Sequence, residues 1–241
     1  MSESGNITVV TAVLNAVDSL EGTILSVLDL AYDNLEYIIV DGGSTDGTLE
    51  IIKRYHDSLK CWLSEPDDGV YAAMNKGWCL ADNDSWIMFL GSGDHLLSLP
   101  RLTALPRADL KVLFGEVELA NNEVFRSSAD CCLKLYNSLH HQGVLVPKRL
   151  HPEPPFNPSY LYYADFDFNQ RLYKAGVPFE FEPAIRAYAA PDGLTRDLQL
   201  SELLRIVKKN YGVFWWLLSF AGFLSARYLP VLNRFRPIKS R

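Results

Sequence analysis

Two acidic side chains occur where predicted strands end. Asp41 ends the β-branched run 36–41, and Asp94 follows the run 86–90 after two glycines. Because the carboxyl ends of parallel strands meet at one edge of a sheet, we expect both carboxylates at the same rim. A carboxylate at such a rim either accepts hydrogen bonds within its own turn, as Asp commonly does, or binds a ligand. Both interpretations are open for Asp41 and for Asp46 in the turn that follows it.

An alternation of strands and helices must position these acids. Four strands are predicted, at 7–13, 36–41, 61–64 and 86–90. The segments between them have helical spacing, at about 19–30, from 47 onward and at 70–78. This order predicts right-handed βαβ units in a mostly parallel sheet, with ligands at the carboxyl ends of the strands.

Beyond residue 100 the pattern is looser. The strands predicted there are 112–117 and 144–147, and a helix is predicted at 165–175. We expect this part to complete the same sheet and to form a second binding surface. The length of the chain suits one substantial core, with or without a small appendage.

Charge is distributed unevenly along the chain. From Glu202 onward the chain contains eight Lys or Arg residues and one acid, which gives this segment a formal charge of +7. The preceding part has a formal charge of −13. An acidic body argues against a nucleic-acid partner, because phosphate binding depends on Lys and Arg. The four cysteines have no C-x-x-C spacing, so neither a zinc site nor a disulfide framework is predicted. No positively charged leader precedes the first strand, and a reducing cytoplasmic location is expected.

Four loops carry a more specific signal. In chain order they are T-A-V-L-N from Thr11, D-G-G-S-T-D-G-T from Asp41, S-E-P-D-D-G-V-Y-A-A-M-N-K-G from Ser64 and F-L-G-S-G-D from Phe89. Together they resemble the nucleotide-sugar half of family 2 glycosyltransferases of the kind that build bacterial exopolysaccharides. The resemblance extends over residues 7–94 almost without gaps and continues more weakly to about Thr195.

The resemblance implies an α/β GT-A fold with a Rossmann-like, mostly parallel sheet. The glycosyltransferase domain would occupy residues 1–200, with a nucleotide-sugar half at 1–98 and an acceptor half at 99–200. It also implies a nucleotide-diphosphate sugar as donor. The residues implied in donor binding are Thr11, Asn15, Asp41, Asp67, Asn75, Lys76, Ser92 and Gly93.

These residues would contact different parts of the donor. Thr11 and the chain to Asn15 would line the nucleotide pocket, and Asp41 would accept hydrogen bonds from the N–H groups of the base. The segment 67–76 would border the ribose and the diphosphate. Lys76 either neutralises phosphate charge or is simply solvated.

The family's loop after the fourth strand carries two acids around one residue, a D-x-D motif that binds a divalent cation on the two phosphates. In this chain Ser92 replaces the first acid, which leaves Asp94 as the implied ligand of Mg²⁺ or Mn²⁺. A hard cation of this kind keeps several waters and can be held by one carboxylate plus substrate phosphates. Weak cation binding without nucleotide is therefore expected.

The acceptor half must supply a base for the acceptor hydroxyl. Segment 163–172 resembles the family's E-D region and points to Asp165 as that base, with Asp167 as the alternative; Ala164 replaces a common Glu. Both acids could instead serve only to stabilise a helix N-terminus. His141 precedes a predicted strand and is implied as an acceptor contact. The loop 192–196 resembles one that closes over the site.

The segment 201–241 is predicted to be a basic, hydrophobic helical tail. No charge occurs between Asn210 and Ala226, and basic residues flank this run on both sides. Such a helix suits the surface of an anionic membrane, where a lipid-linked saccharide acceptor would be found at the inner face of the cell membrane. Packing on the protein's own core or on a second subunit is the alternative.

The sequence therefore predicts a metal-dependent inverting glycosyltransferase of bacterial surface polysaccharide synthesis. A second interpretation is a catalytically silent scaffold that binds nucleotide sugar or lipid at the membrane. A nucleotidyltransferase fits less well, because the loop after the first strand lacks the basic residues that a triphosphate would need.

Overall fold

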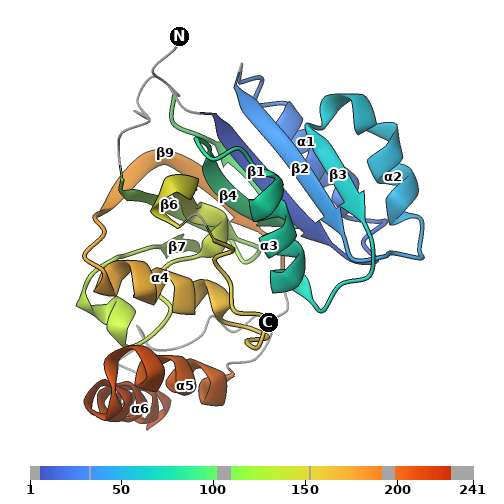
Figure 1. The fold of residues 1–241 in the computed structure, drawn as a ribbon. Helices are drawn as coiled ribbons and strands as arrows, with labels where there is room; N and C mark the ends of the chain where they lie inside the picture. Colours follow the sequence, from blue (N-terminus) through green and yellow to red (C-terminus); the bar gives the residue numbers. More distant parts are fainter. Residues whose placement is uncertain (1–5, 33, 102–109, 152, 192–198, 229–241) are drawn as a thin grey trace.

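The computed structural model describes residues 6–32, 34–101, 110–151, 153–191 and 199–228, with side chains to residue 225. One mixed sheet of nine strands runs through the molecule in the order β3-β2-β1-β4-β8-β6-β9-β5, and β7 pairs with β6 beside this path. Figure 1 shows the sheet with helices on both faces and α5 and α6 together at the lower end. The expected loop at 192–196 lies outside the described residues.

The first part of the sheet is parallel, as predicted. It contains β1 (Ile7–Val13), β2 (Leu35–Asp41), β3 (Cys61–Ser64) and β4 (Trp86–Gly91). β1 pairs in parallel with both β2 and β4, and Val13 lies opposite Asp41 in the register. The β-branched runs fit these strands because branched side chains pack well on both faces of a pleated surface.

Alternate residues of these strands enter two separate cores. Val10, Ile38 and Phe89 pack with α3 (Val70–Leu80) and the later helices, whereas Val9 and Ile39 pack with the helices on the other face. Those helices are α1 (Leu20–Leu28) and α2 (Thr48–Arg54). The sheet therefore fixes which loops reach the common rim at the carboxyl ends of β1, β2 and β4.

The second part of the sheet mixes strand directions. It contains β5 (His95–Ser98), β6 (Val112–Leu119), β7 (Val124–Arg126), β8 (Val144–Pro147) and β9 (Phe179–Ala189). β8 joins β4 and β6 by antiparallel pairs, while β6 and β9 run parallel with a register shift. β6 and β8 were predicted from the sequence; β5, β7 and β9 were not.

Short 3₁₀ turns and one helix complete the second half. The turns there are η3 (Cys131–Lys134), η4 (His141–Gly143) and η5 (Lys148–Leu150), while η1 (His56–Ser58) lies in the first half between α2 and β3. Helix α4 (Ala164–Lys174) begins one residue before the predicted start and is almost entirely buried. Its first turn is therefore held among side chains from both halves of the sheet.

The C-terminal segment forms two helices, α5 (Leu200–Tyr211) and α6 (Val213–Tyr228). They are separated at Gly212, whose φ of +88° lies in the left-handed region that favours glycine. Leu203, Ile206 and Val207 of α5 enter the same core as α4. Among the described residues no helix is long and apolar enough to cross a membrane.

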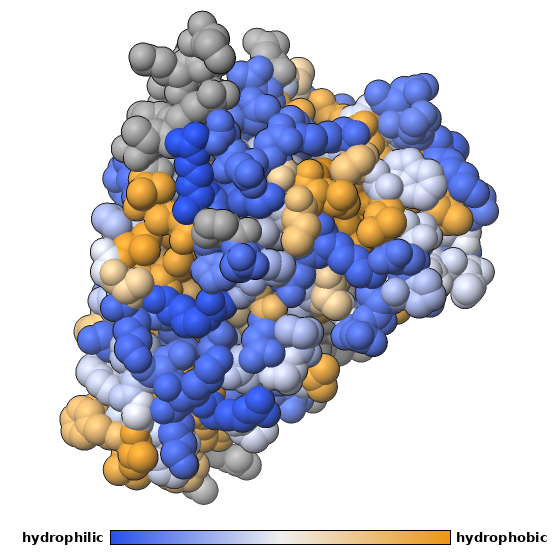
Figure 2. All heavy atoms as spheres, in the orientation of Figure 1, coloured by the Kyte–Doolittle hydropathy of each residue, from blue (hydrophilic) through white to orange (hydrophobic). Residues whose placement is uncertain are grey.

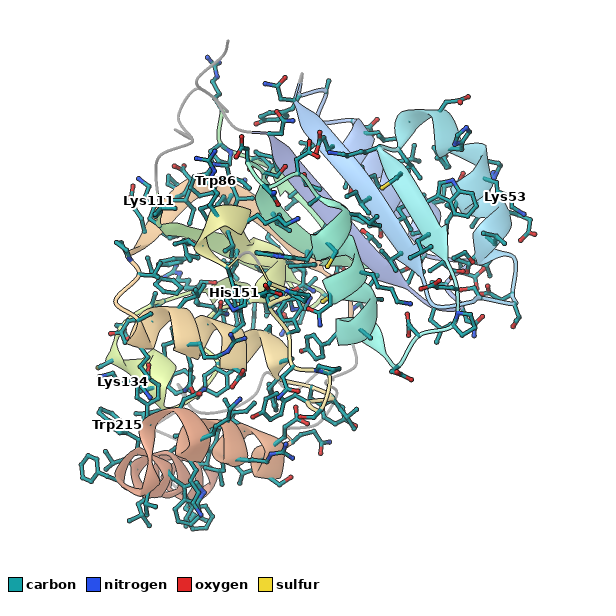
Figure 3. All side chains as sticks on the ribbon, viewed as in Figure 1. Lys53, Trp86, Lys111, Lys134, His151 and Trp215 are labelled. Carbon is teal, nitrogen blue, oxygen red and sulfur yellow. The ribbon has the colours of Figure 1, made fainter. Side chains whose placement is uncertain are left out.

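Only one face of α6 packs on the protein. Ser219 donates to the carbonyl of Leu135 at 2.6 Å, and the Lys134 ammonium lies 4.8 Å from the centre of the Trp215 ring, as Figure 3 shows for the two labelled residues. The exposed face of α6 carries six large apolar side chains: Val213, Phe214, Leu217, Leu218, Phe220 and Leu224. Figure 2 shows this hydrophobic surface at the lower end of the molecule.

Candidate active site

Asp41 organises the loop that follows β2. Its carboxylate is fully buried and accepts hydrogen bonds from the backbone N–H of Ser44 at 3.1 and 3.2 Å and from the Ser64 hydroxyl at 2.6 Å. The Ser44 hydroxyl donates to it as well. In this arrangement the carboxylate holds the ends of β2 and β3 together. Its predicted contact with a nucleotide base stays a prediction.

The loops after β1 and β2 are tied to each other by Asn15. Its Oδ1 accepts the N–H of Thr45 at 2.9 Å, and its own N–H donates to Ser44 Oγ at 2.7 Å. Thr11 lies deeper, with its hydroxyl 2.9 Å from that of Tyr37 between the sheet and α1. Asn15 is thus at the open rim, whereas the Thr11 side chain is buried in the core.

The segment before α3 approaches this rim closely. The Asp67 carboxylate accepts the N–H of Gly69 at 2.9 Å and lies against Gly42, where a Cβ atom would be only 2.8 Å from Asp67 Oδ2. Residue 42 must be glycine for this contact to persist. Lys76 points its ammonium to Glu65 at 2.7 Å, so its charge is already paired across the same loop.

Asn75 connects α3 to the second half of the molecule. Its amide donates to the carbonyl of Phe156 at 2.7 Å and accepts the N–H of the same residue at 2.9 Å. Both polar ends of the side chain are used in this pair. The predicted contact of Asn75 with the sugar donor therefore stays a prediction, because both ends of its amide already bond Phe156.

The turn after β4 places Ser92, Gly93 and Asp94 together. Ser92 Oγ lies 2.9 Å from Ser19 Oγ, and the N–H of Gly93 donates to Thr23 Oγ1 at 2.8 Å. Gly93 has a φ of +94°, a conformation that L side chains rarely adopt. The turn is thus fastened to α1, and its acid points the other way, into the protein.

Asp94 is 5% exposed and joins three segments. Its Oδ2 accepts the N–H of Gly91 at 2.8 Å and the Nε2–H of Gln142 at 2.7 Å. Its Oδ1 accepts the N–H of Ala190 at 2.9 Å. No cation of the described part of the chain forms an ion pair with this carboxylate, so it is a buried negative charge supported by hydrogen bonds alone.

Asp165 is also buried, at 6% exposure in the first turn of α4. The Tyr71 hydroxyl lies 3.2 Å from Oδ1, Asn137 Nδ2 donates to Oδ2 at 3.3 Å, and His141 Nδ1 lies 3.9 Å from Oδ2. Burial, followed by the charge of Asp165, holds the pKa of Tyr71 well above its usual range, so the phenol stays a proton donor. Asp165 and His141 also line a small cavity of about 20 Å³ with Phe89 and Phe156.

Asp167 has a different environment from Asp165. It is 1% exposed, and its carboxylate accepts from Arg171 at 3.0 Å, Lys209 at 3.1 Å and Asn210 at 3.1 Å. These bonds join α4 to α5 and neutralise the charge. Of the two candidate bases, Asp165 is therefore the one that borders a cavity.

The turn η4 lies between the two carboxylates. His141 approaches Asp165, and the next residue, Gln142, donates to Asp94. One 3₁₀ turn thus contacts an acid at the end of β4 and an acid at the start of α4. This relation brings together the two acids predicted for the donor and acceptor sides.

Four residues around these acids were not singled out from the sequence: Tyr71, Asn137, Gln142 and Glu202. Glu202, on α5, accepts three backbone N–H groups, from residues 161–163, at 2.8 to 2.9 Å just before α4. Tyr71 lies inside the motif from Ser64 quoted above, and Gln142 directly follows His141, so their positions were visible but their roles were not. Glu202 and Asn137 carry no local signal, since their partners are distant in sequence.

The donor set at Asp94 is compatible with a hard divalent cation. A carboxylate has about four acceptor positions, and three N–H groups occupy Asp94, two on Oδ2 and one on Oδ1. With the donors of the described residues counted, one position therefore remains, on Oδ1, which suits monodentate binding of Mg²⁺ or Mn²⁺ with water and phosphate as further ligands. The only group of three clustered metal-type ligands among the described residues is elsewhere, at Asp130, Cys131 and Cys132.

Comparison with known proteins shows that this chain is similar to glycosyltransferases. Residues 8–99 match the model of Glycosyl transferase family 2. A PGL/p-HBAD biosynthesis glycosyltransferase of Mycobacterium tuberculosis is 29% identical over 205 residues, which cover 80% of each chain. An uncharacterized glycosyltransferase of the same species is 36% identical over 96 residues, 39% of this chain and 36% of that one.

Solved structures share the fold. The mannosyltransferase PcManGT from Pyrobaculum calidifontis, in complex with GDP-Man and Mn²⁺, superposes with a TM-score of 0.65 at 15% identity and covers 96% of this chain and 74% of its own. A piece of S. aureus TarS in complex with UDP gives 0.61 at 16% identity, over 85% of this chain and 65% of that one. This chain spans 38% of the longer TarS chain.

Proposed function

Residues 8–99 carry the family 2 glycosyltransferase pattern on a GT-A fold, and from this premise we propose that the chain is a metal-dependent inverting glycosyltransferase. It would move a sugar from a nucleotide-diphosphate sugar to a hydroxyl of a saccharide or a lipid-linked acceptor, in bacterial surface polysaccharide synthesis. The observation that carries the proposal is the pair of buried carboxylates, Asp94 and Asp165, that η4 contacts with consecutive residues.

The donor would bind at the rim formed by the loops after β1, β2 and β4. Asn15 and Asp67 lie at this rim, where the Asp67 carboxylate rests against Gly42. Lys76 would reach phosphate by exchanging its ion pair with Glu65, which costs little because both side chains are partly exposed. UDP, UDP-GlcNAc and GDP-Man are the ligands in the complexes of the structural relatives, which supports a nucleotide sugar here.

Asp94 would hold the cation through Oδ1. The chemistry that a bound Mg²⁺ or Mn²⁺ supplies is positive charge for the diphosphate as it departs. Ser92 would remain available to the ribose or to a water, since within the described residues its hydroxyl is paired only with that of Ser19.

Asp165 would act as the base. The proton of the acceptor hydroxyl passes to the Asp165 carboxylate, the hydroxyl oxygen forms a bond to the anomeric carbon, and the bond from that carbon to the diphosphate breaks with its electron pair on the diphosphate. Attack from the face opposite the leaving group inverts the configuration. His141, partly exposed beside Asp165, would contact the acceptor.

The exposed face of α6 would contact the membrane. Its six large apolar side chains are unlike an ordinary solvent-exposed helix surface, which is polar. The adjoining α5 exposes basic residues, including Arg205 and Lys208, which would favour anionic lipid. A cytoplasmic enzyme attached in this way to the inner face of the membrane would meet a lipid-linked acceptor there.

A thermal-shift screen tests the proposal. Donors such as UDP-GlcNAc and GDP-Man, with and without Mn²⁺, should raise the melting temperature of the wild-type chain when the right donor and cation are both present. Asp94→Ala should remove the Mn²⁺ dependence, whereas Asp165→Asn should keep donor binding and lose sugar transfer. A chain that no nucleotide sugar stabilises, or an Asp165→Asn variant with full transfer, contradicts the proposal.

A further inference from the structure

Gln142 is the residue at the proposed cation site to which neither the sequence nor the comparisons gave a role. Its side chain is 6% exposed, and its Nε2 donates to Asp94 Oδ2 at 2.7 Å. We propose that Gln142 is a positioning residue for the cation: by occupying Oδ2 it leaves Oδ1 of Asp94 as the oxygen that binds the metal. The inference rests on the proposed function and adds a residue to the same site.

Counting donors on each oxygen supports this assignment. Oδ2 receives two N–H groups, from Gly91 and Gln142, which fills both of its acceptor positions. Oδ1 receives one from the described residues, the N–H of Ala190. Without Gln142 both oxygens would have one open position, and the carboxylate could turn between two ways of meeting a cation.

The orientation of the Gln142 amide is also determined. With its oxygen toward an ionised carboxylate the pair would repel, so only the NH₂ group can face Asp94. The His140 side chain interacts with the Gln142 side chain. In the described part of the chain, His140 Nδ1 and Gln142 Oε1 have no hydrogen-bond partner of ordinary geometry. Burial keeps water from competing for the Nε2–H bond, which strengthens it.

A site with one acid depends on this alignment more than a site with two. Ser92 is neutral and lies against Ser19, so the second charge of a D-x-D motif is missing next to Asp94. Hydrogen bonds to a metal-binding carboxylate typically change metal affinity about 10-fold to 100-fold. Gln142 would thus support the cation without contacting it.

Mn²⁺ binding to the full chain provides the test, by electron paramagnetic resonance of the free ion, with and without UDP or GDP. Asp94→Asn gives the background from other sites. Gln142→Leu, which keeps the size and removes the donor, should weaken Mn²⁺ binding about 10-fold or more. Gln142→Met, a flexible side chain of similar size that also lacks a donor, should show the same loss and replaces the Leu variant if that one does not fold.

Asn137→Leu is the matched control. Asn137 donates an amide N–H to the other carboxylate, Asp165, and its Oδ1 also lacks a partner in the described residues. Its Mn²⁺ affinity should equal that of the wild type. Unchanged Mn²⁺ affinity in a folded Gln142 variant, or an equal loss in Asn137→Leu, overturns the inference and leaves the proposed function standing. A wild-type chain without Mn²⁺ binding above the Asp94→Asn background overturns both.

Discussion

Asp165 and Asp167 are separated by one residue on α4, yet their carboxylates meet different partners. Asp165 borders a cavity and contacts Tyr71 and Asn137, whereas Asp167 lies between Arg171 and Lys209. Residues two apart on a helix point to nearly opposite sides, so one acid can serve chemistry while the other joins helices. Substituting each acid on its own should therefore distinguish their roles.

We expect Asp165→Asn to lower the turnover number about 10²-fold to 10⁴-fold, because the base is lost, with little change in stability. Asp167→Asn should instead lower the free energy of unfolding by roughly 1.5–3 kcal/mol, because charged hydrogen bonds to α5 are lost. Urea denaturation and a transfer assay measure the two effects. The assignment fails if Asp167→Asn abolishes transfer in a folded protein while Asp165→Asn does not.

Tyr71 links the donor half to Asp165. Its hydroxyl lies 2.8 Å from the carbonyl of Tyr162 and 3.2 Å from Asp165, and one proton must serve both acceptors. Tyr71→Phe should reduce the turnover number about tenfold or more while the affinity for the donor nucleotide is unchanged. Tyr163→Phe, at another buried phenol near the site, is the control and should keep full turnover. Equal turnover losses in both variants would argue for a general packing effect.

Gly42 and Asp67 offer a steric test of the donor loop. Gly42→Ala should displace the Asp67 carboxylate, because the new Cβ would lie 2.8 Å from its Oδ2. The expected result is weaker nucleotide binding in the thermal-shift assay. In an Asp67→Ala background the clash is gone, so Gly42→Ala should then have no further effect. If the double variant lost nucleotide affinity equal to the sum of the two single losses, this account would be contradicted.

The exposed face of α6 can be tested with lipid vesicles. Replacing Phe214 and Leu217 by Ser should weaken cosedimentation with anionic phosphatidylglycerol vesicles about tenfold or more, since each large apolar side chain contributes about 1.5–3 kcal/mol when buried. Leu25 on α1 is also an exposed large apolar residue, and Leu25→Ser is the control with unchanged binding. If the wild type does not sediment and elutes as a dimer instead, α6 is an interface between subunits.

Acid should destabilise the fold through His140. Burial, and next the charge of His141, lower the pKa of His140 from 6.5 to about 3. The unfolded chain then binds the proton more readily, so the free energy of unfolding falls as the pH drops from about 6.5 toward 3, by up to about 1.4 kcal/mol per pH unit. His140→Gln should flatten this slope in denaturation series at pH 7, 6 and 5. A slope identical to that of the wild type would exclude His140 as its source.

The first half of the fold could be predicted because its signals are local. The runs 7–13 and 61–64 became strands with those bounds, since β-branched residues between turn residues define a covered parallel strand. β9 was missed because its residues 179–189 mix charges, Pro183 and a register shift, and only its long-range pairing with β6 makes it a strand. Propensity does not encode such pairings.

The candidate site was predicted in part for the same reason. Asp94 and Asp165 could be identified from motifs, but their surroundings depend on contacts across the sheet, such as that of Gln142 with Asp94. No pattern indicated that Asn75 and Phe156 bond to each other, and packing of the C-terminal segment on the core, where α5 lies beside α4, was only the alternative interpretation. Side chains whose partners are 40 to 100 residues away carry no pattern that spacing can reveal.

Glu202 has a consequence for how this chain can be shortened. It belongs to the first turn of α5, yet it binds three successive amides immediately before α4. A chain truncated before Glu202 would lose the anchor of segment 161–163, which leads into α4, whereas one truncated after Gly212 would keep it. Helix α5, which leads to the exposed apolar face of α6, thus also holds the segment before Asp165 in place through Glu202.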